Sequence, residues 1–365
     1  MNDRKGVDRI FLAIVVTLIV VGFLIFVSAS FGTWAKNSSK FLNLLLSQIV
    51  FGLCGGLALM YIASKMRLVI LRKHAFWIFL TSVIIALLVL VPGLGMEHGG
   101  AKRWIDLGFT TFQPGELLKL GVIIYLATWL TLHKKRIHSA LFGIYPLLAV
   151  LGIACAIFLA QRDTGSFLVV GFAGTAMYIA AGARWRDIAM LFLIAIIGLG
   201  ALAMWRPYVL DRFETLWNHD DMQGSGYQLK QSLIAIGSGE ITGKGFGQSI
   251  QKFNYLPEAH GDSIFAVAGE EFGFIGSTFL VLLYILFGLR GLWISAHAEN
   301  TFSALLVVGL VTVIMSQSFI NISSMLGLVP VTGVPLVFVS HGGTALLFAL
   351  LSIGLILNVS RHRVV

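Results

Sequence analysis

The sequence predicts an all-α polytopic membrane protein with about ten transmembrane helices and one long extracytoplasmic loop between helices 7 and 8. Hydrophobic residues make up 57% of the 365 residues and charged residues only 12%. The mean hydropathy is +0.89. This composition lies far outside the balance of a soluble domain. Only residues 205–272 are both long and polar enough to leave the membrane, so we expect residues 1–365 to form a single membrane domain.

A bilayer core about 30 Å thick needs about 20 apolar residues per helix, and the chain contains a series of such runs. The predicted spans are residues 10–27, 41–63, 74–91, 112–132, 141–160, 167–181, 188–204, 273–294, 302–320 and 343–359. The sixth and seventh are short, and only the hydrophilic residues 182–187 separate them. The first run is not expected to be a cleaved signal peptide, because Ser28-Ala29-Ser30 is a weak cleavage site.

The basic residues of the short loops predict the orientation. Most of them fall on the side of the two termini: Arg4, Lys5, Arg9, Lys65, Arg67, Arg72, Lys73, Lys134, Lys135, Arg136, Arg184, Arg186, Arg361 and Arg363. By the positive-inside rule that side is the cytoplasm, and the loop 205–272 faces outward. The net charge of +9 then reflects topology and contact with anionic lipid, not nucleic acid. Cys54 and Cys155 lie in apolar runs and are expected to be packing residues.

Residues 255–276 concentrate charge in a chain where charge is scarce, just before an apolar run. They contain four carboxylates and a histidine, namely Glu258, His260, Asp262, Glu270 and Glu271. Asp262 precedes the apolar residues 264–267, and apolar surroundings raise a carboxylate pKa towards the range useful for a general base. Glu270 and Glu271 are expected to be structural, since acidic groups favour the positive end of the following helix.

Two other outward loops carry candidate site residues. Glu116 and Lys119 lie one turn apart on a helix that begins near Pro114, so they form either a self-neutralising pair or part of a functional site. Asp163 is either the N-cap of the next span or a site residue. Both alternatives stay open at the level of sequence.

Two glycine-containing loops complete the outward face. The run Gly243-Lys244-Gly245-Phe246-Gly247 could cradle phosphate with backbone N–H groups or could be a flexible loop. No strand precedes it, which argues against a P-loop or a Rossmann motif. Residues 325–343 are apolar but broken by proline and glycine, and such backbone is tolerated at membrane depth only inside protein or beside a cavity. We expect this loop to re-enter the membrane beside the site.

Four motifs occur in one order along nearly the whole chain. They are Lys102-Arg103-Trp104-Ile105, then Gln113-Pro114-Gly115-Glu116, then residues 255–262 with 269–273, and finally residues 330–333 with 340–343. Together they resemble the SEDS family, the FtsW, RodA and SpoVE proteins, and lean towards FtsW. The resemblance implies a peptidoglycan glycosyltransferase that polymerises lipid II into a growing glycan chain in division or elongation. It also implies a class B penicillin-binding protein as transpeptidase partner, and other divisome or elongasome membrane proteins.

The resemblance also assigns residues. Asp262 takes the place of the family's essential outward aspartate, and Arg103, Glu116, Lys119 and Asp163 match its cavity residues. The chain departs from the usual family pattern at Gly115, Gly261, Ser263 and His341. None of these departures removes a charged group, so they bear on loop stiffness and subfamily more than on catalysis.

The implied reaction needs a base and a cation. The C4 hydroxyl of an acceptor GlcNAc attacks the anomeric carbon of a MurNAc that carries a lipid pyrophosphate, with inversion. Asp262 is the expected base, and Arg103 and Lys119, with Lys102 beside them, are expected to stabilise charge on the pyrophosphate.

The expected cofactor is at most a metal ion. A divalent cation such as Mg²⁺ or Mn²⁺ could help to bridge the pyrophosphate. No dense ligand cluster indicates a permanent metal site, and no organic cofactor is expected. Glu258 and His260 either tune Asp262 or bind such an ion, or they belong to a polar loop at headgroup level.

Two other classes of function are compatible with parts of the sequence. A lipid II flippase would also have many spans, buried ionisable residues and a broken outer loop. Against it, the polar candidates gather on the outward half, and no inverted repeat is visible. A division scaffold without catalysis would leave the carboxylate of Asp262 unexplained. The glycosyltransferase is therefore the preferred hypothesis.

Overall fold

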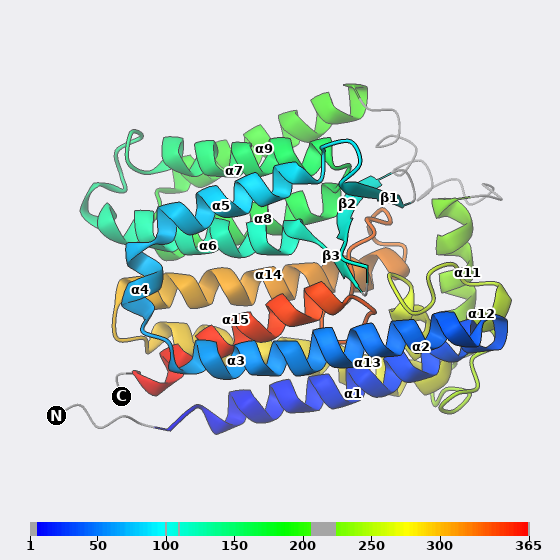
Figure 1. Cartoon of the computed structure of the whole chain (residues 1–365). Helices are drawn as coiled ribbons and strands as arrows, with labels where there is room; N and C mark the ends of the chain where they lie inside the picture. Colours follow the sequence, from blue (N-terminus) through cyan, green and yellow to red (C-terminus); the bar gives the residue numbers. More distant parts are fainter. Residues whose placement is uncertain (1–5, 99–100, 109, 206–223, 364–365) are drawn as a thin grey trace.

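The computed structural model describes residues 6–98, 101–108, 110–205 and 224–363, and its long helices run side by side in a bundle (Figure 1). In the first half these are α1 (Arg9–Lys36), α2 (Ser38–Leu46), the π-helix η1 (Ser47–Gly55), α3 (Gly56–Lys65), α4 (Leu68–Lys73), α5 (Ala75–Leu88), α6 (Pro114–Leu132), η2 (Lys134–Arg136), α7 (Ile144–Ala160) and α8 (Thr164–Ala180). The second half contains α9 (Trp185–Trp205), α11 (Ser225–Ser238), α12 (Gln251–Asn254), α13 (Ile264–Ala296), α14 (Thr301–Met325) and α15 (Gly343–Arg361).

Every predicted span overlaps a helix, and the predicted fold class is confirmed. Within the described residues, 6 helical stretches are long and apolar enough to cross a membrane, counting 41–65 as one stretch. The helices α5, α7 and α8 are apolar but shorter. The number of crossings therefore stays a prediction. Part of the predicted outward loop, residues 206–223, lies outside the described residues.

Both described ends of the chain lie at the same end of the bundle (Figure 1). Asp8 caps α1 by accepting a hydrogen bond from Phe11 N at 2.8 Å, and its carboxylate pairs with Arg290 of α13 at 2.7 Å and with Arg363. A carboxylate at the start of a helix satisfies an unpaired N–H and suits the positive end of the helix dipole. This cluster ties the start of α1 to the ends of α13 and α15.

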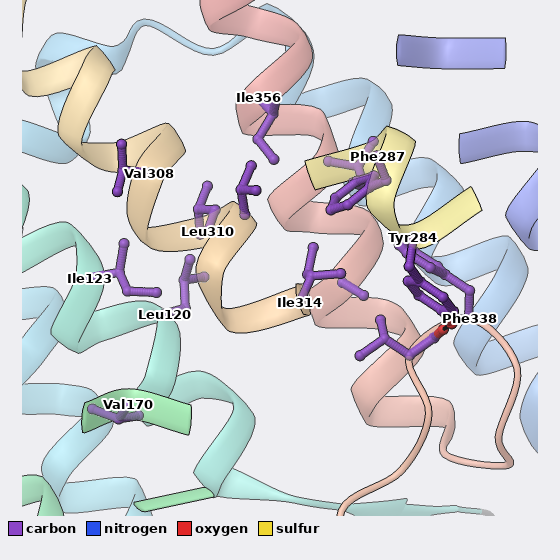
Figure 2. Close-up of a cluster of buried hydrophobic side chains, with 14 of the residues drawn as sticks. Leu120, Ile123, Val170, Tyr284, Phe287, Val308, Leu310, Ile314, Phe338 and Ile356 are labelled. Atoms are coloured by element: carbon purple, nitrogen blue, oxygen red, sulfur yellow. Dashed lines mark hydrogen bonds between the residues drawn. The ribbon is translucent and has the colours of Figure 1, made fainter. Parts of the chain in front are cut away.

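The centre of the bundle is built from α6, α14 and α15. In their most apolar windows 67%, 61% and 83% of the residues are buried, against 33% for α1. Figure 2 shows side chains of α6, α14 and α15 in one buried cluster, including Leu120, Ile123, Leu310, Ile314 and Ile356. The loop between α14 and α15 (residues 326–342) therefore starts and ends in the middle of the protein, where it can line a site.

A three-stranded antiparallel sheet, which the sequence did not predict, precedes α6. It consists of β1 (Gly95–His98), β2 (Ala101–Asp106) and β3 (Thr111–Phe112), in the order β1-β2-β3. Successive side chains of a strand point to opposite faces. Arg103 is consequently buried against the bundle while Lys102 is exposed, so the sheet separates two cations that are adjacent in sequence.

The helix α13 begins at Ile264, earlier than the predicted residue 273, and is kinked at Gly273, whose φ is 63° and ψ −161°. The carbonyls of Glu270 and Glu271, just before the kink, accept the N–H groups of Lys244 and Gly245 at 3.0 and 2.9 Å. A β-carbon on Gly273 would stand 2.3 Å from the nitrogen of residue 243, so only glycine allows this approach. The glycine run is thus bound to α13. The N–H groups of Gly243, Lys244 and Gly245 are already bonded to protein carbonyls.

Candidate functional site

The carboxylate of Asp262 and the guanidinium of Arg103, from distant parts of the chain, meet at Gly333 in the α14–α15 loop. The point where a β-carbon on Gly333 would stand is 3.3 Å from Asp262 Oδ2 and 3.5 Å from Arg103 Nη1. Gly333 has a φ of +70°, a conformation that glycine adopts without strain. The missing side chain leaves room for both charged groups at one place.

The backbone at Asp262 is held by α14 and by the α14–α15 loop. Asn321 of α14 donates through Nδ2 to the carbonyl of Asp262 at 2.7 Å and to the carbonyl of Val334 at 2.8 Å. Ser340 Oγ donates to the carbonyl of Gly261 at 2.8 Å. These bonds fix the backbone on both sides of the carboxylate, which itself is half-buried. The site is therefore rigid where the acid group stands, and part of the acid group stays accessible.

Arg103 reaches the same place from β2 and is only 6% exposed. Its guanidinium donates to the carbonyl of Arg162 and, at 3.5 Å, to that of Gly333, and lies 3.8 Å from Asp163 Oδ1. Within the described part of the chain, Arg103 Nε, Asp163 Oδ2 and Thr332 Oγ1 are buried without a hydrogen-bond partner. Buried polar atoms in native proteins are normally satisfied. Three such atoms together indicate a place built for a polar ligand.

Asp163 is the N-cap of α8, as one of the two sequence interpretations predicted, and it also lies beside Arg103. Its Oδ1 accepts a hydrogen bond from Ser166 N at 3.1 Å and caps α8. The same carboxylate is 1% exposed and faces Arg103. A capped helix start is rigid. Asp163 therefore acts as a fixed counter-charge that orients the guanidinium.

Glu116 and Lys119 lie in the bundle centre as a closed pair. Their charged atoms are 2.7 Å apart, and Lys119 Nζ also donates to Gln317 Oε1 at 2.7 Å. Together they line a small cavity of about 20 Å³ between α6, α14 and α15. Gln317 Nε2 donates to the carbonyl of Pro335 at 3.4 Å, which links the pair to the α14–α15 loop. Glu116 and Lys119 thus form the self-neutralising ion pair of one of the two sequence interpretations. Through Gln317 the pair also supports the α14–α15 loop.

The remaining candidates lie around this centre. Lys102 is exposed and its nearest carboxylate is Glu97, 4.0 Å away on β1. Glu258 and His260 line a separate cavity of about 460 Å³ between the C-terminal end of α1 and residues 254–260. The backbone N–H of His341 donates to the carbonyl of His260 at 2.8 Å.

Glu270 and Glu271 are structural, as expected, but the physical reason differs. Glu270 pairs with Lys244 at 2.7 Å, and Glu271 pairs with the fully buried Lys252 at 2.6 Å and accepts from Ser28 of α1. Buried carboxylates need such partners because an unpaired charge away from water is very unfavourable. The two pairs fasten residues 239–254 to α13 and α1, and no helix terminus is involved.

Sequence reasoning missed the side chains that hold the site together. Asn321 and Gln317 lie four residues apart on α14 and both are buried. Residues at that spacing share one face of a helix. Two amides on one face of an apolar span were a readable signal for a polar layer inside the bundle.

Among the described residues, no group of three or more His, Cys, Asp or Glu side chains could hold a metal ion.

The fold and the site together define a polytopic membrane protein with a partly buried pair of opposite charges, Asp262 and Arg103, at one end of a helical bundle. A family model described as cell cycle protein, FtsW/RodA/SpoVE, matches residues 8–364. The chain belongs to this family, and the resemblance drawn from the four motifs is confirmed.

Curated relatives and a solved structure match over almost the full length. Stage V sporulation protein E of Bacillus subtilis is 37% identical, covering 99% of both chains. A protein of Geobacter sp. named probable peptidoglycan glycosyltransferase FtsW is 34% identical, covering 99% of this chain and 98% of its own. A chain from a structure described as structural coordination of polymerization and crosslinking by a peptidoglycan synthase complex superposes with a TM-score of 0.79 at 26% identity, covering 98% of each.

Proposed function

We propose that this protein is a peptidoglycan glycosyltransferase that polymerises lipid II, with its site on the extracytoplasmic face and both termini in the cytoplasm. Membership of the family and the name of the Geobacter relative support the activity. The observation that carries the proposal for the site is the meeting of Asp262 and Arg103 at Gly333. Such an arrangement supplies both groups that the reaction needs.

Asp262 is the general base in this proposal. As the acceptor C4 oxygen bonds to the anomeric carbon of the donor, its hydroxyl proton passes to the Asp262 carboxylate. The bond from that carbon to the pyrophosphate oxygen breaks in the same displacement, and the electron pair leaves with the lipid pyrophosphate. A single displacement inverts the anomeric centre. The half-buried position of Asp262 suits a base that must meet a sugar hydroxyl.

Arg103 is the proposed ligand of the leaving group. A guanidinium offers several N–H donors in a planar fork that matches phosphate oxygens, and low exposure strengthens the interaction. Its unpartnered Nε and the fixed counter-charge of Asp163 support this role. Lys119 is less suited than the sequence indicated, since Glu116 and Gln317 already occupy its ammonium group. Its role becomes support of the α14–α15 loop.

Lys102, Glu258 and His260 are proposed to contact the substrate further from the reacting atoms. Lys102 is exposed on β2, where it can meet the headgroup of lipid II. A class B penicillin-binding protein is the proposed partner, and likeness to a chain of a peptidoglycan synthase complex supports it. A divalent cation that bridges the pyrophosphate is part of the proposal, and chelation of the purified protein with EDTA, followed by return of Mg²⁺ or Mn²⁺, tests it.

The decisive experiment incubates purified protein with lipid II, with and without the cognate transpeptidase, and separates the glycan products on a gel. Asp262→Ala is expected to abolish polymer. Asp106→Asn is the matched control, because Asp106 is an exposed aspartate of β2 and is expected to keep full activity. Polymer made equally well by Asp262→Ala would remove that residue from the mechanism. Lipid II translocation in liposomes without any polymer would favour the flippase instead.

A further inference from the structure

A basic cavity lies at the end of the bundle opposite the Asp262 site. A cavity of about 560 Å³ opens between the end of α3, the start of α4, the first turn of α14 and the end of α15. Four cationic side chains line it, Lys65, Arg67, Arg72 and Arg361, against the single carboxylate of Glu299. In Figure 1 this is the end with the two termini and α4.

No carboxylate of the described residues neutralises the cations in this cavity. Among the described residues, no carboxylate lies within 4.0 Å of any of the four, and Lys65 bonds only to the hydroxyl of Tyr61. Other cations at this end of the bundle are paired: Arg290 and Arg363 both contact the carboxylate of Asp8. Like charges gathered around a hollow repel one another unless an anion lies between them.

The walls of the cavity are fixed by packing. Asn358 of α15 donates to the carbonyls of Ala63 at 2.8 Å and Met66 at 2.6 Å. These bonds satisfy the last carbonyls of α3 and fasten the turn before Arg67 against α15. The cations that line the hollow therefore come from a defined surface and not from a loose tail.

Apolar side chains adjoin the cations and indicate the kind of anion. Leu68, Val69 and Phe302 line the same cavity. Val69 and Ile70 on α4 are 75% and 49% exposed, next to Arg72. A short helix with exposed aliphatic residues and basic neighbours suits the boundary between lipid chains and headgroups. An acidic peptide would need no such apolar wall, whereas a lipid phosphate with its acyl chains uses both parts.

We propose that this cavity binds the phosphate of an anionic lipid headgroup, with Arg67 and Arg72 as its main ligands and Lys65 and Arg361 at its sides. Arginine forks bind phosphate oxygens in pairs, and basic pockets between membrane helices are suited to lipid phosphates. The site is independent of the polymerisation site, which lies at the other end of the bundle. Its occupation would fasten α3, α4, α14 and α15 together at that end.

The test compares two variants that each lose two positive charges from the same end. Arg67→Gln/Arg72→Gln removes the proposed ligands, whereas Lys73→Gln/Lys135→Gln removes two exposed lysines that do not line the cavity. The purified full chain is titrated with mixed micelles of phosphatidylglycerol, with phosphatidylcholine micelles as reference, and the thermal unfolding midpoint is read. The unfolding midpoint in phosphatidylcholine alone shows that both variants fold.

Phosphatidylglycerol is expected to raise the midpoint of the wild type and of the lysine variant, and to bind the arginine variant at least about tenfold more weakly. Competition by inorganic phosphate at similar occupancy would assign the site to a free anion of the same chemistry, while no competition assigns it to the lipid. Equal loss of binding in both variants would overturn the proposal, because the charges would then act only as a diffuse field. Tighter binding of a polyglutamate peptide than of the lipid would overturn it as well.

Discussion

Gly333→Ala tests the geometry of the proposed active site without removing a charged group. The new methyl group would stand 3.3 Å from Asp262 Oδ2 and 3.5 Å from Arg103 Nη1. The first of these contacts is tighter than an ordinary van der Waals contact, so the carboxylate must move by a few tenths of an ångström. The methyl group would also occupy the space in which we place the reacting pyrophosphate and sugar.

Two effects are expected, and the structure separates them. A side chain at a φ of +70° lowers stability by about 1–2 kcal/mol, which follows from the backbone alone. Displacement of catalytic groups by about 1 Å can reduce a rate about 100-fold, so a shift of a few tenths of an ångström is expected to reduce kcat about tenfold. The measured quantities are the thermal unfolding midpoint and the initial rate of lipid II polymerisation at a temperature where the variant stays folded.

Gly327→Ala is the matched control for this prediction. Gly327 lies in the same α14–α15 loop with a φ of +71°, but its β-carbon would meet only Leu229 and Leu233 of α11, at 3.5 Å or more. It is expected to lower the unfolding midpoint like Gly333→Ala and to leave the rate of the folded protein unchanged. Equal losses of rate in the two variants would refute the assignment of Gly333 to the active site.

Three further predictions concern the groups that support the site and the ends of the chain. Lys119→Met leaves the carboxylate of Glu116 buried without its cation and is expected to destabilise the protein by about 3–5 kcal/mol, while Glu116→Leu/Lys119→Met recovers most of this loss in chemical denaturation. Persistent loss in the double variant would contradict the closed-pair interpretation. Asn321→Leu removes two hydrogen bonds, one to the carbonyl of Asp262, so about 2 kcal/mol of stability and part of kcat should be lost; unchanged kcat in the folded variant would argue against its positioning role. Although burial opposes it, hydrogen bonds from Arg290 and the N–H of Phe11 hold the pKa of Asp8 below its usual range. The Asp8 carboxylate therefore stabilises the folded protein above the unfolded pKa of 3.8, and this stabilisation is lost as the pH falls through the lower pKa of the folded state. Below pH 3.8 the thermal unfolding midpoint of the wild type should fall more steeply with pH than that of Asp8→Asn.

Much of the chain could be predicted from its one-dimensional pattern. The apolar runs predicted the helices because a lipid-embedded backbone must satisfy its own hydrogen bonds, and a helix does so locally. The motifs around Arg103, Glu116 and Asp262 predicted the family because each of them is a contiguous run of residues that can be recognised in the sequence alone. Asp163 was recognised as a possible N-cap because capping depends on residues only a few positions apart.

The predicted eighth span begins at residue 273, whereas the helix α13 begins at Ile264. The sequence assigned residues 264–272 to the loop, yet they are helical, and Glu270 and Glu271 pair there with Lys244 and Lys252 from a distant segment. At the kink before Gly273, the carbonyls of Glu270 and Glu271 accept hydrogen bonds from the glycine run 243–247. Nothing within a helical window of residues 264–296 carries that information.

The sequence by itself determined the class of protein, the approximate helices, the family and the charged candidate residues of the site. Only the tertiary structure decided which of those charges work together. It brings Arg103 to Asp262 at Gly333, turns Lys102 to the opposite face of β2, and closes Lys119 onto Glu116 and Gln317 in the bundle centre. The physical reason is range: helix formation and capping act over a few residues, whereas the pairing of buried charges is settled by packing between segments far apart in the chain.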